Sequence, residues 1–255
     1  MKTTPKIAVY SGTRNIYEDM EVSARSLIAF SDVDAVYFMI EDLEFPRKLP
    51  PIVTCINVSD QGFFPADGPN MNSHFTYMAM MRACLAKLFP HLDRILSLDA
   101  DTVCIHDVSD IWNLPIDGYY LSASVEPKQD NKHLFPEPAA NLSGQDEYFN
   151  TGVALYNLDM LRDGKCDEAI DLLNTEKFRF LEQDVFNKIC AGQIFPMPSR
   201  YNYCDFTERL GIDQEPDIWH FAGYKKFQHF TIWEAMSTLT WEDAMRMHAE
   251  RVAGN

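Results

Sequence analysis

Short apolar runs alternate along the chain with stretches of helical periodicity. Runs that end at polar or glycine residues are typical of buried strands, and apolar positions three or four residues apart are typical of helices. The expected strands span residues 6–10, 35–40, 52–58, 94–98, 119–125 and 149–156. The expected helices span 18–30, 73–88, 167–175 and 182–191, with two amphipathic stretches between 231 and 252. This alternation predicts an α/β fold with a mostly parallel, Rossmann-like central sheet flanked by helices.

The chain has 255 residues, which allows one large domain or two small ones. Residues 127 to 147 are rich in Pro, Asn, Gln and charged residues, so we expect a long loop there. Internal repeats and a clear linker are not visible in the sequence. The pattern therefore favours one main domain over residues 1–229, with residues 230–255 as a helical extension that packs on it or follows it.

Polar side chains follow two of the expected strands at the point where each strand ends. Ser11 to Asn15 follow the first strand, and Asp99-Ala100-Asp101 follow the strand at 94–98. In open parallel sheets ligands bind beyond the carboxyl ends of the strands. Two acids separated by one small residue can turn toward one Mg²⁺ or Mn²⁺ ion, because these cations prefer oxygen ligands. The alternative is that these aspartates cap turns, which is common at strand ends.

A histidine far downstream is a candidate third ligand. The segment His220-Phe-Ala-Gly223-Tyr-Lys-Lys226 follows an apolar pair and contains a glycine and two lysines. The imidazole of His220 can complete an Asp/Asp/His metal set, and Lys226 can reach phosphate oxygens past Gly223. A lone histidine is more often structural, so this hypothesis depends on the two aspartates.

Four motifs occur in the order and spacing of one known family. They are Leu98-Asp99-Ala100-Asp101, Phe149-Asn150-Thr151-Gly152-Val153, Glu182-Gln183-Asp184-Val185-Phe186-Asn187 and His220 to Lys226. With them the chain resembles family 8 glycosyltransferases from Ile7 to about Lys226. This family includes bacterial lipopolysaccharide galactosyl- and glucosyltransferases and glycogenin. The resemblance implies a GT-A fold and a retaining hexosyl transfer from a UDP-sugar.

The resemblance also implies roles for individual residues. Asp99, Asp101 and His220 would hold Mn²⁺ or Mg²⁺, which grips the donor diphosphate, and Lys226 would contact the same diphosphate. The residues that would line the donor site are Ser11, Gly12, Thr13, Asn15, Tyr17, Arg82, Ala100, Glu126, Asn150, Thr151 and Gly223. Two of these have plain structural alternatives. Tyr17 can be an ordinary aromatic residue at a helix start instead of stacking on the base, and Arg82 can be a solvated helix residue.

The segment Glu182-Gln183-Asp184 resembles the Asp-Gln-Asp of the family, which lies at the reacting face of the donor sugar, and its three residues are the catalytic candidates. The first acid is lengthened to Glu here. The first loop also departs from the family, because Thr13 and Arg14 stand where an acid is common. A second interpretation of residues 182–184 is an acid-rich helix N-terminus, which the helix dipole favours.

The resemblance and the chemistry of these candidate residues together predict how the glycosidic bond of the donor breaks. Its transition state is oxocarbenium-like, and a bound cation with Lys226 would stabilise the departing diphosphate. Gln183 is a poor nucleophile because its amide is neutral, so we favour front-face attack, with Glu182 or Asp184 orienting hydroxyl groups. The acceptor is expected to be a glycan or glycoconjugate. The alternatives are a sugar-phosphate nucleotidyltransferase, for which Ser11 to Asn15 is a poor phosphate loop, and a non-catalytic sugar-nucleotide-binding protein.

Composition narrows the partners further. A formal net charge of −16 argues against nucleic acid and allows at most a peripheral association with an anionic membrane. The six cysteines are scattered without the spacing of a zinc knuckle, which is typical of reduced thiols in a cytoplasmic protein. The N-terminus lacks the long apolar stretch of a signal peptide, and no run approaches the length of a membrane span. The sequence predicts no oligomeric state.

Overall fold

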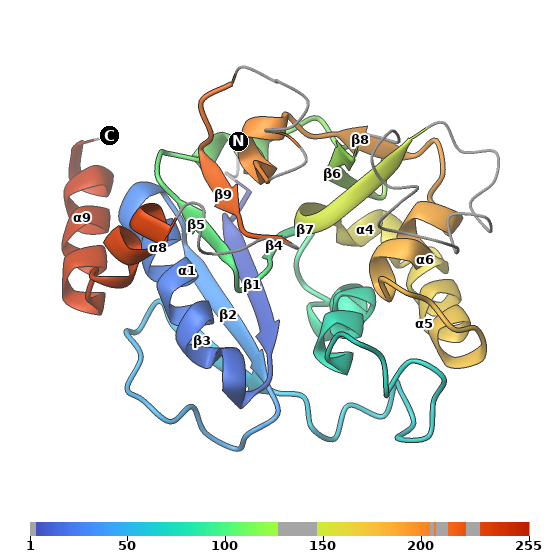
Figure 1. Cartoon of the computed structure of the whole chain (residues 1–255). Coiled ribbons are helices and arrows are strands. Elements are labelled where there is room, and N and C mark those ends of the chain that lie inside the picture. The colour runs from blue at the N-terminus through green and yellow to red at the C-terminus, as the bar shows by residue number, and fades with distance from the viewer. Residues whose placement is uncertain (1–3, 127–146, 205–206, 208–213, 223–229, 255) are drawn as a thin grey trace.

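A seven-stranded sheet forms the centre of the fold in the computed structural model, which describes residues 4–126, 147–204, 207, 214–222 and 230–254 (Figure 1). The order of its strands is β3-β2-β1-β4-β7-β6-β8. Their bounds are β1 Ile7–Gly12, β2 Ala35–Ile40, β3 Val53–Asn57, β4 Arg94–Leu98, β6 Leu121–Glu126, β7 Tyr148–Asn157 and β8 Ile194–Pro196. A second sheet pairs β5 Thr102–Cys104 with β9 Ile218–His220.

Most neighbouring strands of the large sheet run parallel, as the sequence predicts. β1 pairs in parallel with β2 and β4, β2 with β3, and β6 with β8. β7 is the exception, because it runs antiparallel to both β4 and β6. The carboxyl ends of β1 and β4 therefore lie at one edge, which β7 enters with its amino-terminal end. This arrangement brings the Asn150 region of β7 beside the end of β4.

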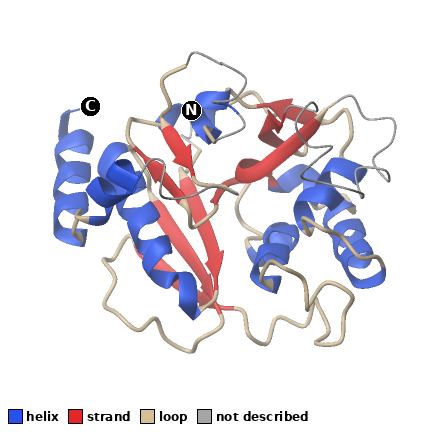
Figure 2. Cartoon of the chain, viewed as in Figure 1, coloured by secondary structure: helices blue, strands red, loops and turns tan. Residues whose placement is uncertain are grey.

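Helices cover both faces of the sheet (Figures 1 and 2). The α-helices are α1 Tyr17–Phe30, α2 Leu85–Leu88, α4 Leu158–Leu161, α5 Lys165–Thr175, α6 Glu182–Ile189, α8 Phe230–Ser237 and α9 Trp241–Gly254. The 3₁₀ helices are η1 Arg14–Ile16, η2 Tyr77–Cys84, η3 Ser109–Asn113 and η5 Ser199–Asn202. Alternate residues of β1 serve the two cores: Ala8 and Tyr10 pack with α1, whereas Ile7 and Val9 pack with η2, α5 and α6. Burial on both faces explains why this strand is apolar from Ile7 to Tyr10.

Two sequence-based expectations differ from the structure. The helix expected over 73–88 is a 3₁₀ helix from Tyr77 to Cys84 and becomes α-helical only at Leu85. Six of its eight residues are buried, so its apolar positions do not form the one-sided pattern that would distinguish the helix type. The strands β5, β8 and β9 were not expected, because three residues are too few to show a period of two.

The small sheet is held against α1 by buried hydroxyl groups. The Ser23 hydroxyl lies 2.8 Å from the Thr102 hydroxyl, and the Ser26 hydroxyl accepts a hydrogen bond from the Cys104 amide. β5 pairs antiparallel with β9, and Thr102 lies opposite His220. This pairing places His220, which is distant in the sequence, beside Asp101.

The C-terminal helix α9 packs against α1. Ala244 is fully buried in the core on that side, and the Trp241 indole donates to the Glu21 carboxylate at 3.2 Å. The His248 ring nitrogen Nδ1 lies 3.2 Å from the Ser31 carbonyl oxygen. Among the described residues, no helix combines the length and apolar character needed to cross a membrane.

We expect Leu96→Ala to lower the free energy of unfolding by about 2–5 kcal/mol, because it leaves a cavity beneath the central strand β4. Leu96 is fully buried there. Urea denaturation measures the change. Leu43→Ala is the matched control, since Leu43 is 92% exposed, and its effect is expected to be within about 0.5 kcal/mol. Equal effects of the two substitutions would contradict the described core.

Candidate metal and donor site

The two aspartates lie at the bend that follows β4. The Asp99 amide donates to the Gly152 carbonyl oxygen at 2.7 Å, which continues the pairing of β4 with β7 by one residue. The Thr102 hydroxyl donates to the Asp99 carbonyl oxygen at 2.9 Å. The bend is therefore closed by the threonine hydroxyl, and the carboxylates of Asp99 and Asp101 face other partners.

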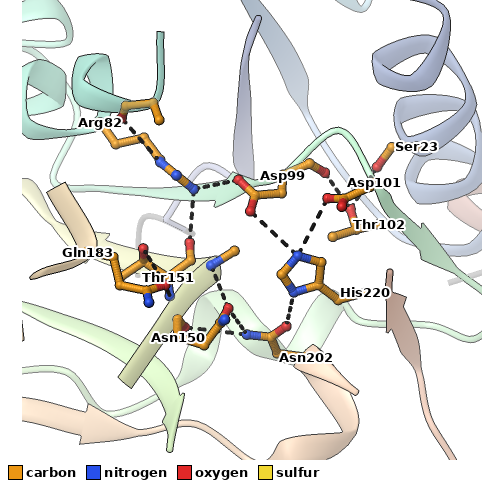
Figure 3. Close-up of polar contacts among 12 residues, drawn as sticks. Ser23, Arg82, Asp99, Asp101, Thr102, Asn150, Thr151, Gln183, Asn202 and His220 are labelled. Carbon is orange, nitrogen blue, oxygen red and sulfur yellow. Dashed lines mark hydrogen bonds and ion pairs between the residues drawn. The ribbon is translucent and has the colours of Figure 1, made fainter. Parts of the chain in front are cut away.

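His220 joins the two carboxylates in one cluster (Figure 3). Its Nε2 atom lies 3.5 Å from an oxygen of Asp99 and 3.5 Å from an oxygen of Asp101. One ligand atom from each of the three residues lies within 4.8 Å of the other two. The imidazole is buried, whereas the Asp99 and Asp101 side chains are 35% and 34% exposed. The histidine thus forms the buried side of the cluster, and the two aspartates form the side that solvent can reach.

The charges of this cluster fit a bound cation. Burial by itself would lower the pKa of His220, but the Asp101 and Asp99 carboxylates raise it well above the ordinary value. Burial would likewise raise the pKa of Asp99, but Arg82 and His220 lower it to about 2. The carboxylates thus hold a positive charge between them, supplied by the imidazolium. Two carboxylates and an imidazole are a donor set suited to Mn²⁺ or Mg²⁺.

Arg82 lies on the other side of Asp99. Its guanidinium is 2.6 Å from Asp99 and 2.5 Å from Glu182, and it also donates to the Thr151 carbonyl oxygen. Burial alone would lower the pKa of Arg82, but Asp99 and Glu182 raise it. Arg82 is 8% exposed, so it is a buried bridge between η2, β4 and α6 and not a solvated helix residue.

Glu182 begins α6 and is fully buried. Its second oxygen, Oε2, has no hydrogen-bond partner among the described residues. Burial raises the pKa of Glu182 to about 7, although the charge of Arg82 acts in the opposite direction. The preceding residue, Leu181, has φ 49°, which is rare for a leucine and marks local backbone strain at the helix start.

Gln183 and Asp184 are tied to neighbouring main chain. The Gln183 side-chain oxygen accepts from the Thr151 amide at 2.9 Å, and its nitrogen donates to the Tyr148 hydroxyl. One oxygen of Asp184 accepts from the Arg179 and Phe180 amides, and the other accepts from the Tyr148 hydroxyl. Asp184 therefore organises the turn before α6.

Asn150 is the centre of a buried amide network beneath the cluster of Asp99, Asp101 and His220. It donates to the Glu126 carboxylate at 2.6 Å and accepts from the Gly152 amide at 2.9 Å. It also accepts from Asn202 at 3.0 Å, and Asn202 in turn contacts His220. Sequence reasoning missed Asn202, because the surrounding Ser-Arg-Tyr-Asn-Tyr carries no motif, and only its contacts identify it.

The donor-site candidates at the end of β1 and just after it, Ser11 to Tyr17, differ in their surroundings. Ser11 and Gly12 belong to β1, and a Cβ atom on Gly12 would lie 2.6 Å from Ile16, so close packing explains this glycine. Thr13 and Asn15 are hydrogen-bonded through their side chains. The Tyr17 ring is 1% exposed and packs against Phe45, so it presents no free face to a base, and its structural interpretation is favoured.

Gly152 lies directly beneath the His220 ring. A Cβ atom at this position would be 2.1 Å from the His220 Cε1 atom. Only a glycine leaves room for the imidazole here. Ala100 is half-buried between the two aspartates, while Gly223 and Lys226 lie outside the described residues.

Comparison with known proteins gives a matching family and several relatives. Residues 43–230 match the profile of glycosyl transferase family 8. A putative glycosyltransferase of Haemophilus influenzae is 26% identical over 172 residues, which are 63% of this chain and 52% of that protein. A lipopolysaccharide 1,2-glucosyltransferase of Escherichia coli is 35% identical over 116 residues, 44% of this chain and 33% of that protein. The chain thus spans from a third to about half the length of these relatives.

A solved structure supports the fold. The galactosyltransferase LgtC, solved with donor and acceptor sugar analogues, covers 93% of this chain and 99% of its own at a TM-score of 0.64 and 17% identity. At this identity the similarity concerns the fold alone. The GT-A fold implied by the sequence is confirmed.

We expect Gly152→Ala to displace the His220 ring, because a methyl group at this position and the imidazole cannot occupy the same space. The affinity for Mn²⁺, followed by electron paramagnetic resonance of free Mn²⁺, is expected to fall at least tenfold. Gly254→Ala is the matched control, since a Cβ atom there meets no atom within 4 Å. Unchanged Mn²⁺ affinity in a folded Gly152→Ala protein would contradict the assigned cluster.

We expect Glu182 to make the free energy of unfolding depend on pH. Its pKa of about 7 in the folded protein lies above the ordinary 4.5, so its protonated form favours folding. That contribution is present below about pH 4.5 and is lost as the pH rises through 7. Glu182→Gln is expected to flatten this decline, which is on the order of 1–3 kcal/mol, in urea denaturation at a series of pH values. The exposed Glu44→Gln control is expected to keep the wild-type slope, and an unchanged slope in Glu182→Gln would refute the assignment.

Proposed function

Because the chain belongs to glycosyl transferase family 8, we propose that it is a retaining, metal-dependent hexosyltransferase. It would move a hexose, glucose or galactose, from a UDP-sugar to a glycan or glycoconjugate acceptor. The observation that carries this proposal is the cluster of Asp99, Asp101 and His220 at the carboxyl edge of the sheet, next to the start of α6. This is the edge at which α/β sheets bind their ligands.

Asp99, Asp101 and His220 are the residues that would hold the cation. Mixed carboxylate and imidazole ligands suit Mn²⁺ better than Mg²⁺, which prefers oxygen ligands throughout. A divalent cation bound there supplies a Lewis acid that stabilises negative charge on the donor diphosphate. The protein has a formal net charge of −16, so a cation also offsets the repulsion between its surface and an anionic donor.

The side chains around the cluster have separate roles in this proposal. Arg82 fixes the orientation of Asp99 and compensates the charge of Glu182. Gln183 is held by the Thr151 amide and the Tyr148 hydroxyl, which fixes its position at the expected reacting face. Lys226 would contact the diphosphate, and Ser11, Thr13 and Asn15 would line the nucleoside pocket, as the resemblance implies.

Front-face attack is the mechanism that best accounts for retention of configuration with these residues. Gln183 carries a neutral amide whose oxygen already accepts a hydrogen bond, so it is a weak nucleophile. Glu182 is fully buried against Arg82, which weakens its nucleophilic character as well. In front-face attack the departing phosphate oxygen takes the acceptor's proton, so no carboxylate nucleophile is needed. Gln183 would then orient sugar or acceptor hydroxyl groups around the oxocarbenium-like transition state, and the buried Glu182 would act through Arg82.

The enzyme would act in the cytoplasm on a glycan or glycoconjugate acceptor. All six cysteines are unpaired thiols, which fits a reducing compartment. Residues 230–255 would be an extension of the catalytic domain, since α9 packs on α1.

We expect UDP to bind the wild-type protein in the presence of Mn²⁺ and to bind at least tenfold more weakly without it, as measured by calorimetry. Asp101→Ala is expected to lose the metal-dependent part, because one ligand is missing. Asp117→Ala is the matched control, since the Asp117 side chain is 98% exposed, and it is expected to bind as the wild type does. A panel of UDP-hexoses then identifies the donor by turnover. If the affinity for UDP is the same with and without Mn²⁺ and is unchanged in Asp101→Ala, the proposed role of the carboxylates is refuted.

A further inference from the structure

His220 has a second ring nitrogen that faces away from the two aspartates. Its Nδ1 atom lies 2.7 Å from the side-chain oxygen of Asn202. Asn202 is the last residue of η5 and is 1% exposed. The following residue, Tyr203, accepts a hydrogen bond from the His220 amide at 2.8 Å, so main-chain pairing holds Asn202 beside the imidazole.

The donor and acceptor roles in this network follow from one main-chain group. The Gly152 amide is a donor under all conditions, and it donates to the Asn150 side-chain oxygen at 2.9 Å. The oxygen of Asn150 is therefore fixed on that side. Its NH₂ group consequently faces the Glu126 carboxylate, an acceptor, at 2.6 Å. Both neighbours of Asn150 thus require the same orientation of its amide.

The orientation of Asn202 follows from that of Asn150. The Asn150 oxygen also faces the Asn202 side chain at 3.0 Å, so the group that Asn202 presents there must be its NH₂ donor. The opposite end of the Asn202 amide, its oxygen, then faces His220. An oxygen of an amide can only accept, so the His220 Nδ1 atom must carry a proton.

From this geometry we propose that Asn202 is a positioning residue, which holds His220 with a proton on Nδ1 and so leaves Nε2 to bind the cation. The inference rests on the proposed function, because it concerns the same metal. A neutral imidazole has one protonated nitrogen, and fixing the proton on Nδ1 places the lone pair on Nε2. Nε2 is the atom that faces Asp99 and Asp101 at 3.5 Å. Metal-binding histidines are commonly fixed in this way through their second nitrogen.

The proposal assigns one task to residues from three separate segments. Gly152 and Asn150 belong to β7, Asn202 to η5 and His220 to β9. The Gly152 amide fixes the orientation of the Asn150 amide. From Asn150 the contacts continue through Asn202 to His220 (Figure 3). Replacing either amide by an apolar side chain of similar size interrupts that order while leaving the metal ligands in the sequence.

The first test measures Mn²⁺ binding to the full chain, without donor or acceptor, by electron paramagnetic resonance. Asn202→Leu is expected to weaken binding 10- to 100-fold, as is usual when the partner of a ligating histidine is lost. Asn202→Asp keeps an acceptor for the Nδ1 proton and is expected to recover most of the affinity. Asn157→Leu is the matched control: this buried asparagine lies at the opposite end of β7 and bonds the Ile116 carbonyl and the Met160 amide. Thermal unfolding of each variant separates loss of folding from loss of metal.

The second test observes the proton itself in the presence of Mg²⁺, which is diamagnetic. Without a metal the raised pKa of His220 leaves a proton on both ring nitrogens, so the resonance would not report which nitrogen is free to bind the cation. Wild-type protein labelled with ¹⁵N at histidine Nδ1 is expected to show a slowly exchanging Nδ1–H proton resonance, because His220 is buried. That resonance is expected to be absent from His220→Ala and to be lost or shifted in Asn202→Leu. It should remain in Asn157→Leu.

The outcomes separate this inference from the proposed function. If the wild type binds Mn²⁺, His220→Ala does not, and folded Asn202→Leu binds as the wild type does, the role of Asn202 is wrong and the metal site stands. A wild-type His220 without a proton on Nδ1 also overturns the inference. If the wild type binds no Mn²⁺ even with UDP, the metal site fails and the inference fails with it. Weakened binding in Asn202→Leu, recovery in Asn202→Asp and the Nδ1–H resonance together support the proposal.

Discussion

The carboxylate of Asp99 faces a positive group on each side, and the architecture of the site depends on this arrangement. Arg82 approaches one oxygen from η2, and His220 approaches the other from β9. Charges in a protein interior need compensation, because their removal from water costs several kcal/mol per ion. Arg82 is shared with the buried Glu182, so α6 is tied to the same centre. Three elements that are distant in the sequence thus meet at one aspartate.

The sheet topology makes this meeting possible. β7 runs antiparallel to β4, so its early residues lie beside the end of β4, where Asp99 follows. Asn150, Thr151 and Gly152 each contribute through different atoms: a side-chain amide, a carbonyl oxygen that binds Arg82, and the absence of a side chain beneath His220. Asn150 and Gly152 are therefore explained by hydrogen bonding and packing that depend on their residue types, whereas the carbonyl oxygen at position 151 could come from any residue.

The two sides of the site differ in how firmly they are held. The wall formed by His220, Asn202 and Asn150 is buried and hydrogen-bonded throughout, which restricts its rotamers. The acids Asp99 and Asp101 are about a third exposed, which leaves them accessible to an ion and its ligands from solvent. A rigid histidine with accessible carboxylates suits a cation that arrives together with an anionic donor, as in the function proposed for this family member.

The sequence by itself determined the α/β class, the position of most strands and helices, and the candidate acids, because apolar periodicity and strand-end motifs are local properties of the chain. The sequence also placed Asn150 and Gly152 within a motif, but it did not show which contacts require an asparagine and a glycine at these positions. Only the tertiary structure decided that Arg82 is a buried bridge, that Tyr17 is packed against Phe45, and that Asn202 contacts His220. Pairing of the three-residue strands β5 and β9 joins segments more than a hundred residues apart, and such pairing depends on complementary surfaces that no local pattern records.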